Sequence, residues 1–450
     1  MKHVVVGSGI VGLLIARSLQ TFGKKVVLIE AQDKIGGLLG KSYEYKGLQF
    51  DYGTHLVPTT GNIALDELIL GKKLKYTKNW VNLPVIKSGN FTNGCFNTQS
   101  PYIDLHCLNK KEYAQVCVEM LNAKESKKGV YTLKEQLEAS FGKVVTQKIY
   151  APALKKLFGI DIQLLMKDAY RIFLPPRVIL GSPVVNQALK QSPYFDEKLA
   201  FSSVDESKGV SCMHYYPKKN GVFDWVLRMQ KTFVKQGGEL YKSTTLLHLK
   251  TSKRGVKCTF SNGKKINANS LWWTASPLHL FQLLDKTIKL KKAVSFRQTH
   301  LIHFVFDQPF LTDVSFFTCF DPEFQTFRVT LYPCIHKTSE KMFHCTVEVL
   351  NQVKEIKSSI LIADIEKELK KMGAVASKAQ SLHAVVQSLG NTFPVKDAAF
   401  SEMVQKITKM EQTLPDNIHL EGVAKGHNFF MRDVLLDAYK ALKKSVKSKG

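Results

Sequence analysis

The sequence predicts an α/β protein, and three features near its amino terminus support this prediction. The run Val4-Val5-Val6 is short and β-branched, as expected for a strand that is buried on both faces. A segment of helical character follows and extends to about Phe22, and a second apolar run, 26–29, begins after a turn at Gly23. These elements form a strand–helix–strand unit, and the 450 residues suffice for two or three modules with a buried core.

The turn after the first strand carries three glycines in the spacing GxGxxG. Gly7 would permit the tight turn, Gly9 would let the backbone approach a pyrophosphate, and Gly12 would let the helix pack closely on the strand. The first turn of the helix would offer free N–H groups to that anion. Glu30 lies 18 residues after Gly12, at the end of the second strand, where it would accept hydrogen bonds from ribose hydroxyls. The unit therefore predicts a dinucleotide site.

Composition indicates a folded protein and excludes several function classes. Hydrophobic residues make up 44% and charged residues 23%, which is ordinary for a soluble globular protein. The net charge of +26 would attract phosphates, nucleotides or anionic membranes. Most cations are Lys, and no nucleic-acid-binding signature is present, so nucleic acid is not an expected partner. Eight scattered cysteines predict neither a metal site nor a disulfide framework, and they favour a cytoplasmic location.

Further motifs specify the dinucleotide. Gly36-Gly37 follows the acid and would let the chain pass close to a long cofactor. Segment 51–55 reads DYGTH, segment 216–222 reads YPKKNGV, and segment 271–277 reads LWWTASP. With the GxGxxG turn and Glu30, these motifs resemble the FAD-binding signature of the superfamily of flavin amine oxidases, protoporphyrinogen oxidases and UDP-galactopyranose mutases. Ordered matches run from residue 4 to about residue 434.

The resemblance implies a fold with two domains. One is a discontinuous, Rossmann-like FAD-binding domain, and the other is an α+β substrate-binding domain that carries an antiparallel sheet and a helical insert. The expected FAD-binding segments are 1–75, 205–280 and 385–450, and the expected substrate-binding segments are 76–204 and 281–384. Helical patterns in 105–170 and strand-like alternation in 299–350 agree with this outline. The cofactor-binding residues implied are Gly7, Ser8, Gly9, Ile10, Val11, Gly12, Glu30, Ala31, Gly36, Gly37, Leu38, Gly53, Thr54, His55, Leu246, Thr274, Gly422, Arg432, Asp433 and Val434.

The carboxy-terminal part departs from the family pattern. Segment 390–394 resembles the turn before the last FAD contacts of the family, and the final strand is expected to end near Gly422. Oxidase-like and mutase members then carry an Arg, where this chain has Val423. Contact by backbone N–H groups at a helix start near Asp433 is still expected. The mutases also carry a second His where this chain has Pro58.

The expected activity is that of an FAD-dependent oxidoreductase, in which a substrate passes hydride to flavin N5. His55, beside the flavin, and Arg328, on the substrate-domain sheet, are the candidate catalytic residues. The expected substrate is an anionic or nucleotide-linked small molecule. A mutase that uses reduced flavin as a nucleophile is one alternative, and a flavin-binding protein without turnover is another. Segment 439–449 alternates apolar residues with Lys and could contact an anionic membrane, while the oligomeric state stays open.

Overall fold

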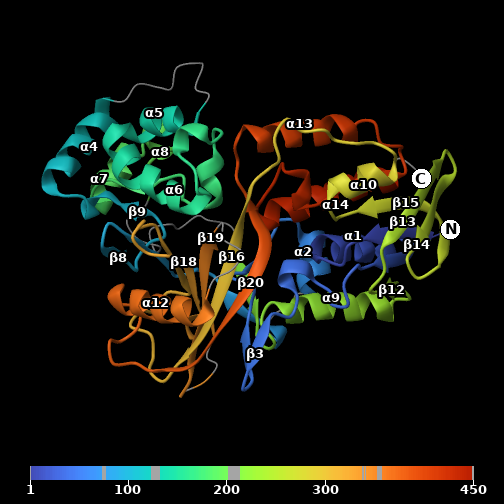
Figure 1. Cartoon of the computed structure of the whole chain (residues 1–450), viewed down its shortest axis with the longest axis horizontal. Coiled ribbons are helices and arrows are strands. Elements are labelled where there is room, and N and C mark those ends of the chain that lie inside the picture. Colours follow the sequence, from blue (N-terminus) through green and yellow to red (C-terminus); the bar gives the residue numbers. More distant parts are fainter. Residues whose placement is uncertain are drawn as a thin grey trace. The chain divides into compact units, whose positions relative to one another are not determined.

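The structure is a computed structural model, and its chain forms two compact units (Figure 1). The residues that it describes are 2–72, 78–122, 132–200, 213–336, 339, 341–351 and 357–447. Unit 1 comprises Met1–Pro84, Ser211–Lys291 and Glu402–Gly450, and unit 2 comprises Val85–Val210 and Lys292–Ser401.

Unit 1 is built on a parallel sheet that confirms the predicted α/β class. Strands β12, β2, β1 and β15 lie in this order, and β21 pairs in parallel with the end of β15. Helix α1 connects β1 to β2, which is the predicted strand–helix–strand unit. The bounds are β1 (Lys2–Val6), α1 (Ile10–Thr21), β2 (Lys25–Ile29), β12 (Glu239–Tyr241), β15 (Lys265–Trp273) and β21 (Ile418–Leu420).

Both faces of this sheet are covered, which explains its continuous apolar strands. Val5, Leu28 and Trp272 face one side and pack with helices α1, α9 (Phe223–Lys235) and α14 (Met431–Lys447). Val4 and Val27 face the other side, toward α10 (Pro277–Leu283), α13 (Ala398–Glu411) and the hairpin of β13 (Leu246–Ser252) and β14 (Gly255–Phe260). Because successive side chains of a strand point to opposite faces, a strand between two layers must be apolar throughout.

Smaller elements complete the described part of unit 1. Strand β11 (His214–Pro217) pairs with β5 (Val57–Pro58) and with β6 (Trp80–Leu83). Helix α2 (Ile63–Leu70) is capped by the side chain of Asn62, which accepts from the N–H of Leu65. The remaining elements are η1 (Gly37–Leu39), β3 (Tyr43–Tyr45), β4 (Leu48–Phe50) and η7 (Val423–Lys425).

Unit 2 combines a mainly antiparallel sheet with a helical insert. Within the described residues the sheet has seven strands in the order β20, β16, β19, β18, β17, β7, β8. Helix α12 (Ser358–Lys371) buries Leu361, Ile365 and Leu369 against it. Helices α4 to α8 form a separate apolar core around Phe141, Leu154 and Phe158.

The strands of unit 2 are β7 (Ser88–Thr92), β8 (Cys95–Asn97), β16 (Phe296–Phe306), β17 (Phe316–Cys319), β18 (Thr326–Leu331), β19 (Phe343–Asn351) and β20 (Ser381–Pro394), with the short pair β9 (Ile103–Asp104) and β10 (Val178–Ile179). The helices of the insert are α4 (Lys110–Asn122), α5 (Leu133–Val145), α6 (Ala151–Phe158), α7 (Pro183–Leu189) and α8 (Pro193–Asp196).

The two units divide the chain differently from the predicted boundaries, and segments 76–84 and 281–291 lie in unit 1. Segment 385–401 lies in unit 2 and not in the unit with the glycine loop, because β20 is a long strand that pairs along β16. The segment 390–394, expected as a turn before cofactor contacts, is the end of that strand. Residues up to Pro84 lie in unit 1, because β6 pairs with β11.

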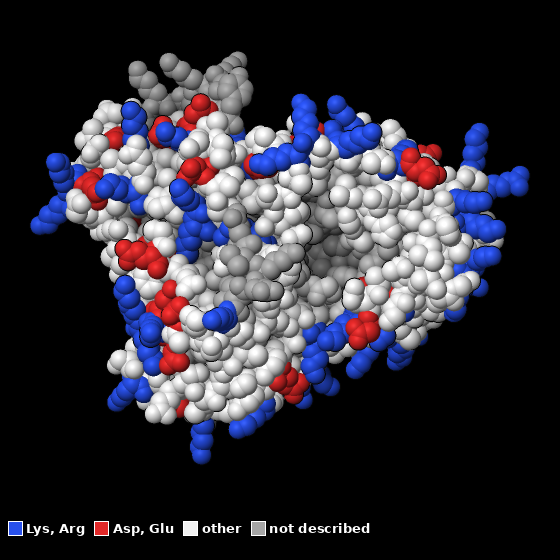
Figure 2. Space-filling view, viewed as in Figure 1, with Lys and Arg blue, Asp and Glu red and all other residues white. Residues whose placement is uncertain are grey.

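On the face shown in Figure 2, Lys and Arg side chains lie mainly around the rim, with acids among them on the left and few acids along the right-hand edge. The predicted basic helix at 439–449 forms the end of α14 up to Lys447, while 448–449 lie outside the described residues, and Tyr439 and Leu442 of its apolar side pack in the core of unit 1. Among the described helices, none combines the length and apolar character needed to cross a membrane.

Candidate functional site

The predicted site residues of unit 1 follow the carboxyl ends of parallel strands. Gly7 follows β1, Glu30 follows β2, Thr274 follows β15, and Gly422 lies two residues after β21. Carboxyl ends of parallel strands meet at one edge of a sheet, and in α/β proteins ligands bind in the crevice beyond that edge. The topology therefore brings together segments that are up to four hundred residues apart in sequence.

Two of the three loop glycines are required by the protein itself. Gly7 has φ +98°, which side chains other than glycine rarely adopt, and its N–H donates to the carbonyl of Ile29 at 2.8 Å. A Cβ on Gly12 would lie 1.8 Å from the carbonyl oxygen of Gly7. Helix α1 thus packs directly on the turn that precedes it, as predicted for the third glycine of the motif.

Gly9 differs from both of these glycines. A Cβ on Gly9 would meet no protein atom within 4 Å, and its backbone has φ −64° and ψ 175°, which any residue can adopt. The carbonyl of Gly9 accepts from the N–H of Leu13 at 3.0 Å, so the first N–H groups of α1 belong to Ile10, Val11 and Gly12. The open space beside Gly9 and these N–H groups fit an anionic ligand at the start of α1.

Glu30 fastens the glycine loop to the end of β2. Its Oε2 accepts from the N–H of Ser8 at 2.9 Å and from the Ser8 hydroxyl at 2.6 Å. Its Oε1 accepts from the N–H of Gln32 at 2.9 Å, and the neighbouring Ala31 is exposed. Since a carboxylate offers about four acceptor positions, Glu30 keeps capacity for a ribose hydroxyl while it holds the loop.

The second glycine pair lies directly beside this loop. Gly36 forms an isolated parallel bridge with Gly9, and its N–H donates to the carbonyl of Ser8 at 3.1 Å. Both glycines have positive φ, and a Cβ on Gly37 would meet nothing within 4 Å. Leu38, which follows, is 54% exposed. Gly37 therefore continues the open strip of backbone that begins at Gly9, whereas a Cβ on Gly36 would lie 3.0 Å from the backbone of Gly40.

Thr274 closes the loop from the other side. Its N–H and its hydroxyl donate to the carbonyl of Val6 at 2.9 and 2.8 Å, and a Cβ on Gly7 would lie 2.5 Å from its Oγ1. Leu246 is only 1% exposed and lies in the core below the hairpin. A ligand contact by Leu246 would therefore come from its main chain.

A buried carboxyl group that the sequence did not single out as a site residue joins two of the motifs. Asp51 accepts from the Tyr216 hydroxyl at 2.6 Å and from the Val222 N–H at 2.9 Å. Burial raises the pKa of Asp51 to about 7, although both hydrogen bonds favour its charged form. Gly221 has φ +59°, and a Cβ there would lie 2.4 Å from Asp51 Oδ1. This contact explains why DYGTH and YPKKNGV occur together.

The segment after Asp51 carries the predicted His55. Gly53 has φ +96°, and His55 Nδ1 lies 3.2 Å from the carbonyl oxygen of Gly53. Since a carbonyl can only accept, Nδ1 carries the proton of this hydrogen bond, and Nε2 of neutral His55 is an acceptor. The sequence predicted His55 as a candidate catalytic residue, and this geometry gives its neutral ring an acceptor at Nε2. Thr54, between the two, is partly buried.

The carboxy-terminal contacts differ in part from the prediction. Gly422 has φ +106° and begins the turn after β21. The N–H groups of Asp433 and Val434 both donate to the carbonyl of Phe430 at 3.1 Å, so they are already used inside the start of α14. Anion contact at this helix would instead use the N–H groups of the two preceding residues. The Arg432 guanidinium makes one long hydrogen bond, of 3.5 Å, to the carbonyl of Thr60.

The architecture matches solved flavoenzymes along nearly its whole length. A crystal structure of reduced UDP-galactopyranose mutase aligns with 99% of this chain and 94% of its own at a TM-score of 0.78 and 15% identity. A putative protoporphyrinogen oxidase from Exiguobacterium sp. 255-15 aligns with 99% of both chains at a TM-score of 0.70 and 16% identity. A putrescine oxidase variant follows at a TM-score of 0.62 and 12% identity. The chain therefore shares the fold of these solved structures.

Sequence comparisons find recognisable similarity in the glycine-loop region. Residues 5–68 match the model of the NAD(P)-binding Rossmann-like domain. An all-trans-retinol 13,14-reductase from Danio rerio is 44% identical over 62 residues, which are 14% of this chain and 10% of the reductase. Lysine-specific histone demethylase 2 from Homo sapiens is 39% identical over 54 residues, 12% of this chain and 7% of the demethylase. The match thus covers a tenth or less of these relatives.

The predicted substrate-side residue of the superfamily fold, Arg328, lies on β18 in unit 2. Its Nε and Nη2 donate to the two carboxylate oxygens of Glu348 on β19 at 2.7 and 2.9 Å. The Glu348 side chain is 3% exposed and that of Arg328 is 25% exposed. This bidentate pair occupies the Nε edge of the guanidinium with a buried carboxylate, so the geometry favours a structural ion pair, and only the remaining N–H groups of Arg328 could contact a substrate.

Proposed function

We propose that this chain is a flavoenzyme that binds FAD at the glycine loop and oxidises a small molecule by hydride transfer. The observation that carries the proposal is the open strip of backbone at Gly9 and Gly37, where an added Cβ would meet no protein atom. It lies beside the Ser8–Glu30 contact, on a fold shared with flavoenzymes over 99% of the chain.

The groups along this open strip of backbone match the chemistry of the pyrophosphate and the ribose of a dinucleotide. The N–H groups at the start of α1 would bind the pyrophosphate, helped by the positive end of the helix dipole. Glu30 would accept from a ribose hydroxyl, and Gly36-Gly37 would let the main chain run close to the cofactor. When bound, the flavin supplies the hydride acceptor, so the protein has to bind it, orient it and exclude water.

His55 is the candidate for proton handling at this site. With Nδ1–H held by the Gly53 carbonyl, neutral His55 presents Nε2 as a proton acceptor. A substrate that loses a proton together with hydride requires such a group within hydrogen-bond reach. We therefore assign His55 the role of proton acceptor. The ion pair with Glu348 makes Arg328 a weaker candidate for binding an anionic substrate.

The first test is whether the purified protein carries flavin. We expect a yellow protein whose oxidised flavin spectrum bleaches under anaerobic conditions with one of three substrate classes, namely amines, porphyrinogens or polyenes. Gly9→Asp places a negative charge and a side chain in the open strip, and this variant should bind no FAD. Retention of FAD by a folded Gly9→Asp protein would contradict the proposed site.

A second candidate function is a non-redox mutase that uses reduced flavin as a nucleophile. It is supported by the similarity to UDP-galactopyranose mutase at a TM-score of 0.78, against 0.70 for the putative protoporphyrinogen oxidase. Pro58 replaces the second His of the mutase pattern and weighs against it. Binding of a UDP-sugar that requires dithionite reduction would favour the mutase. A stable flavin complex that is inert to every class would favour a flavin-binding protein without turnover.

A further inference from the structure

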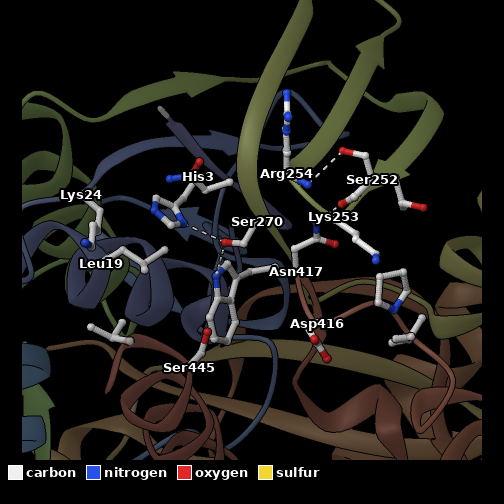
Figure 3. Close-up of a pocket in the computed structure, with 16 residues that line it drawn as sticks. His3, Leu19, Lys24, Ser252, Lys253, Arg254, Ser270, Asp416, Asn417 and Ser445 are labelled. Atoms are coloured by element: carbon white, nitrogen blue, oxygen red, sulfur yellow. Dashed lines mark hydrogen bonds between the residues drawn. The ribbon is translucent and has the colours of Figure 1, made fainter. Parts of the chain in front are cut away.

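A pocket of about 1060 Å³ opens in unit 1 at the amino-terminal edge of the parallel sheet (Figure 3). Its walls come from the start of β1, the end of α1, the tip of the β13–β14 hairpin, the segment before β21 and the last turns of α14. Pockets for small molecules measure roughly 300–1,000 Å³. The volume is therefore sufficient for a ligand of nucleotide size.

This pocket is distinct from the glycine loop. His3, at the start of β1, lines the pocket, whereas Gly7 follows the end of the same strand. Helix α1 likewise begins at Ile10 in the loop and places Leu19 in the pocket wall. An α-helix rises about 1.5 Å per residue, so these two ends are on the order of 14 Å apart.

The mouth of the pocket carries an excess of positive charge. Lys24 comes from the turn between α1 and β2, and Lys253 and Arg254 come from the hairpin tip. Within the described residues, none of these three cations lies within 4.0 Å of a carboxylate, and Asp416 is the acid among the lining residues. Three cations from two separate turns therefore line one pocket with a single acid, Asp416, and this excess of positive charge favours an anionic ligand.

The wall contains a buried acceptor that lacks a partner. Asn417 is 7% exposed, and its Nδ2 donates to the carbonyl of Ser252 at 2.9 Å, whereas its Oδ1 has no hydrogen-bond partner among the described residues. Ser270 Oγ is engaged by Trp272 Nε1 at 3.1 Å and by His3 Nδ1 at 2.8 Å. Buried polar atoms are normally satisfied by protein, water or ligand, so Asn417 Oδ1 is an unsatisfied acceptor inside the wall and not an exposed contact point for a ligand.

Apolar surface lies next to this polar wall. The apolar lining residues are Leu19, Trp272, Leu414, Pro415 and Val446. Leu19 and Trp272 are each 1% exposed, so the apolar surface comes from Leu414, Pro415 and Val446, which are partly buried. A ligand that fits this pocket would carry an anionic group to contact the cations at the mouth. It would also carry a flat or apolar group to contact the apolar lining residues, which form the floor of the pocket. We propose that this pocket is a second ligand site of the protein, for an organic phosphate of nucleotide size whose phosphates contact Lys24, Lys253 and Arg254.

The test is calorimetric titration of the FAD-saturated protein with ATP and, separately, with inorganic pyrophosphate. Saturation with FAD keeps ATP and pyrophosphate out of the glycine loop. In a second arm the titration is repeated on Gly9→Asp, whose glycine loop is blocked by the new side chain, so that any binding of the probes must occur elsewhere. Because the second arm needs no flavin, failure of the proposed function would leave this test intact.

Charge reversal at the pocket should weaken ATP binding. We expect the double variant Lys253→Glu/Arg254→Glu and the single variant Lys24→Glu to bind ATP roughly tenfold or more weakly than wild type. The matched control is Lys250→Glu/Lys257→Glu, which makes the same charge change on the strands of the same hairpin, where the two exposed residues pair with each other outside the pocket. This control should retain the wild-type affinity.

Three results would overturn the proposal. One is the absence of ATP binding to the wild-type protein in both arms. Another is an equal loss of affinity in the pocket variants and in the control, which would indicate general attraction to a chain of net charge +26. The last is pyrophosphate binding as tight as ATP binding, because the apolar floor would then contribute nothing. Stronger binding of ATP than of pyrophosphate, lost only in the pocket variants, would support it.

Discussion

At the scale of single residues, the glycines of the loop divide into those that the fold requires and one that a ligand requires. Gly9→Ala should leave the stability of the apoprotein within about 0.5 kcal/mol of wild type, because its Cβ meets no protein atom. It should nevertheless weaken FAD binding by roughly tenfold or more, because the methyl group occupies space meant for the pyrophosphate. Denaturant unfolding and FAD titration measure the two effects.

Gly12→Ala should have the opposite effect to Gly9→Ala, because it should change the stability of the apoprotein. Its Cβ would lie 1.8 Å from the Gly7 carbonyl oxygen, so the helix must move away from the turn. We expect a loss of about 3 kcal/mol or more in unfolding free energy, at the upper end of overpacking effects. A Gly9→Ala protein that binds FAD as wild type does, or a Gly12→Ala protein of unchanged stability, would contradict this division.

Asp51 predicts a pH dependence of stability. Its pKa is raised by burial from 3.8 to about 7 in the folded chain, so the folded state holds a proton that the unfolded state has released over that range. The stabilising contribution is complete below pH 4 and is lost as pH rises toward 7 and above. Glu421, whose pKa burial also raises to about 7, acts in the same direction.

The variant Asp51→Asn isolates this effect. The amide can donate to the Tyr216 oxygen and accept from the Val222 N–H, as a protonated carboxyl would. Relative to wild type, the variant should therefore gain stability between pH 5 and pH 8, by at most about 1.4 kcal/mol per pH unit. The measurement is the unfolding free energy of both apoproteins at each pH. Parallel pH profiles would refute the assignment, since Glu421 is common to both proteins.

At the scale of elements, one lysine joins the helical insert of unit 2 to its sheet. Lys156 on α6 donates to the carbonyls of Cys319, Asp321 and Thr326 at 3.0, 2.9 and 2.7 Å, and burial lowers its pKa. Lys156→Met removes a charged donor from three acceptors around the β17–β18 connection. We expect a loss of about 2–4 kcal/mol in the unfolding free energy, measured by denaturant unfolding.

The adjacent residue provides a control for this prediction. Lys155 lies on the same helix, is 65% exposed at its side chain and pairs with Asp161 at 2.9 Å. An exposed ion pair contributes about 0–1 kcal/mol, so Lys155→Met should change stability by less than about 1 kcal/mol. Equal losses in the two variants would mean that the three carbonyl contacts of Lys156 are not what holds α6 in place.

The elements that the sequence predicted correctly are those whose signals are local. The unit from β1 to β2 carries its glycines, helix and terminal acid within thirty residues, and it forms as expected. Segment 390–394 was misassigned because its strand character depends on pairing with β16, about ninety residues earlier in the chain. Asp51 was quoted in a motif without a role, because its partners lie 165 and 171 residues away.

At the scale of the whole molecule, the net charge of +26 predicts an effect of salt. Self-repulsion destabilises a compact chain, and the Debye length falls from about 30 Å at 0.01 M to about 8 Å at 0.15 M salt. The melting temperature in sodium chloride should therefore rise over this range. If the melting temperature is constant or falls, the repulsion between lysines is already offset by neighbouring carboxylates.

The contact between Asp51 and Gly221 has a consequence for how such proteins diverge. No side chain fits at 221 while the carboxyl group stays in place, because the two atoms would be 2.4 Å apart. A lineage that keeps the acid therefore needs glycine at 221, whereas in a lineage that loses the acid only the φ of +59° limits this position, and asparagine also tolerates that conformation. The two positions should therefore be inherited as a pair, although 169 residues separate them in the chain.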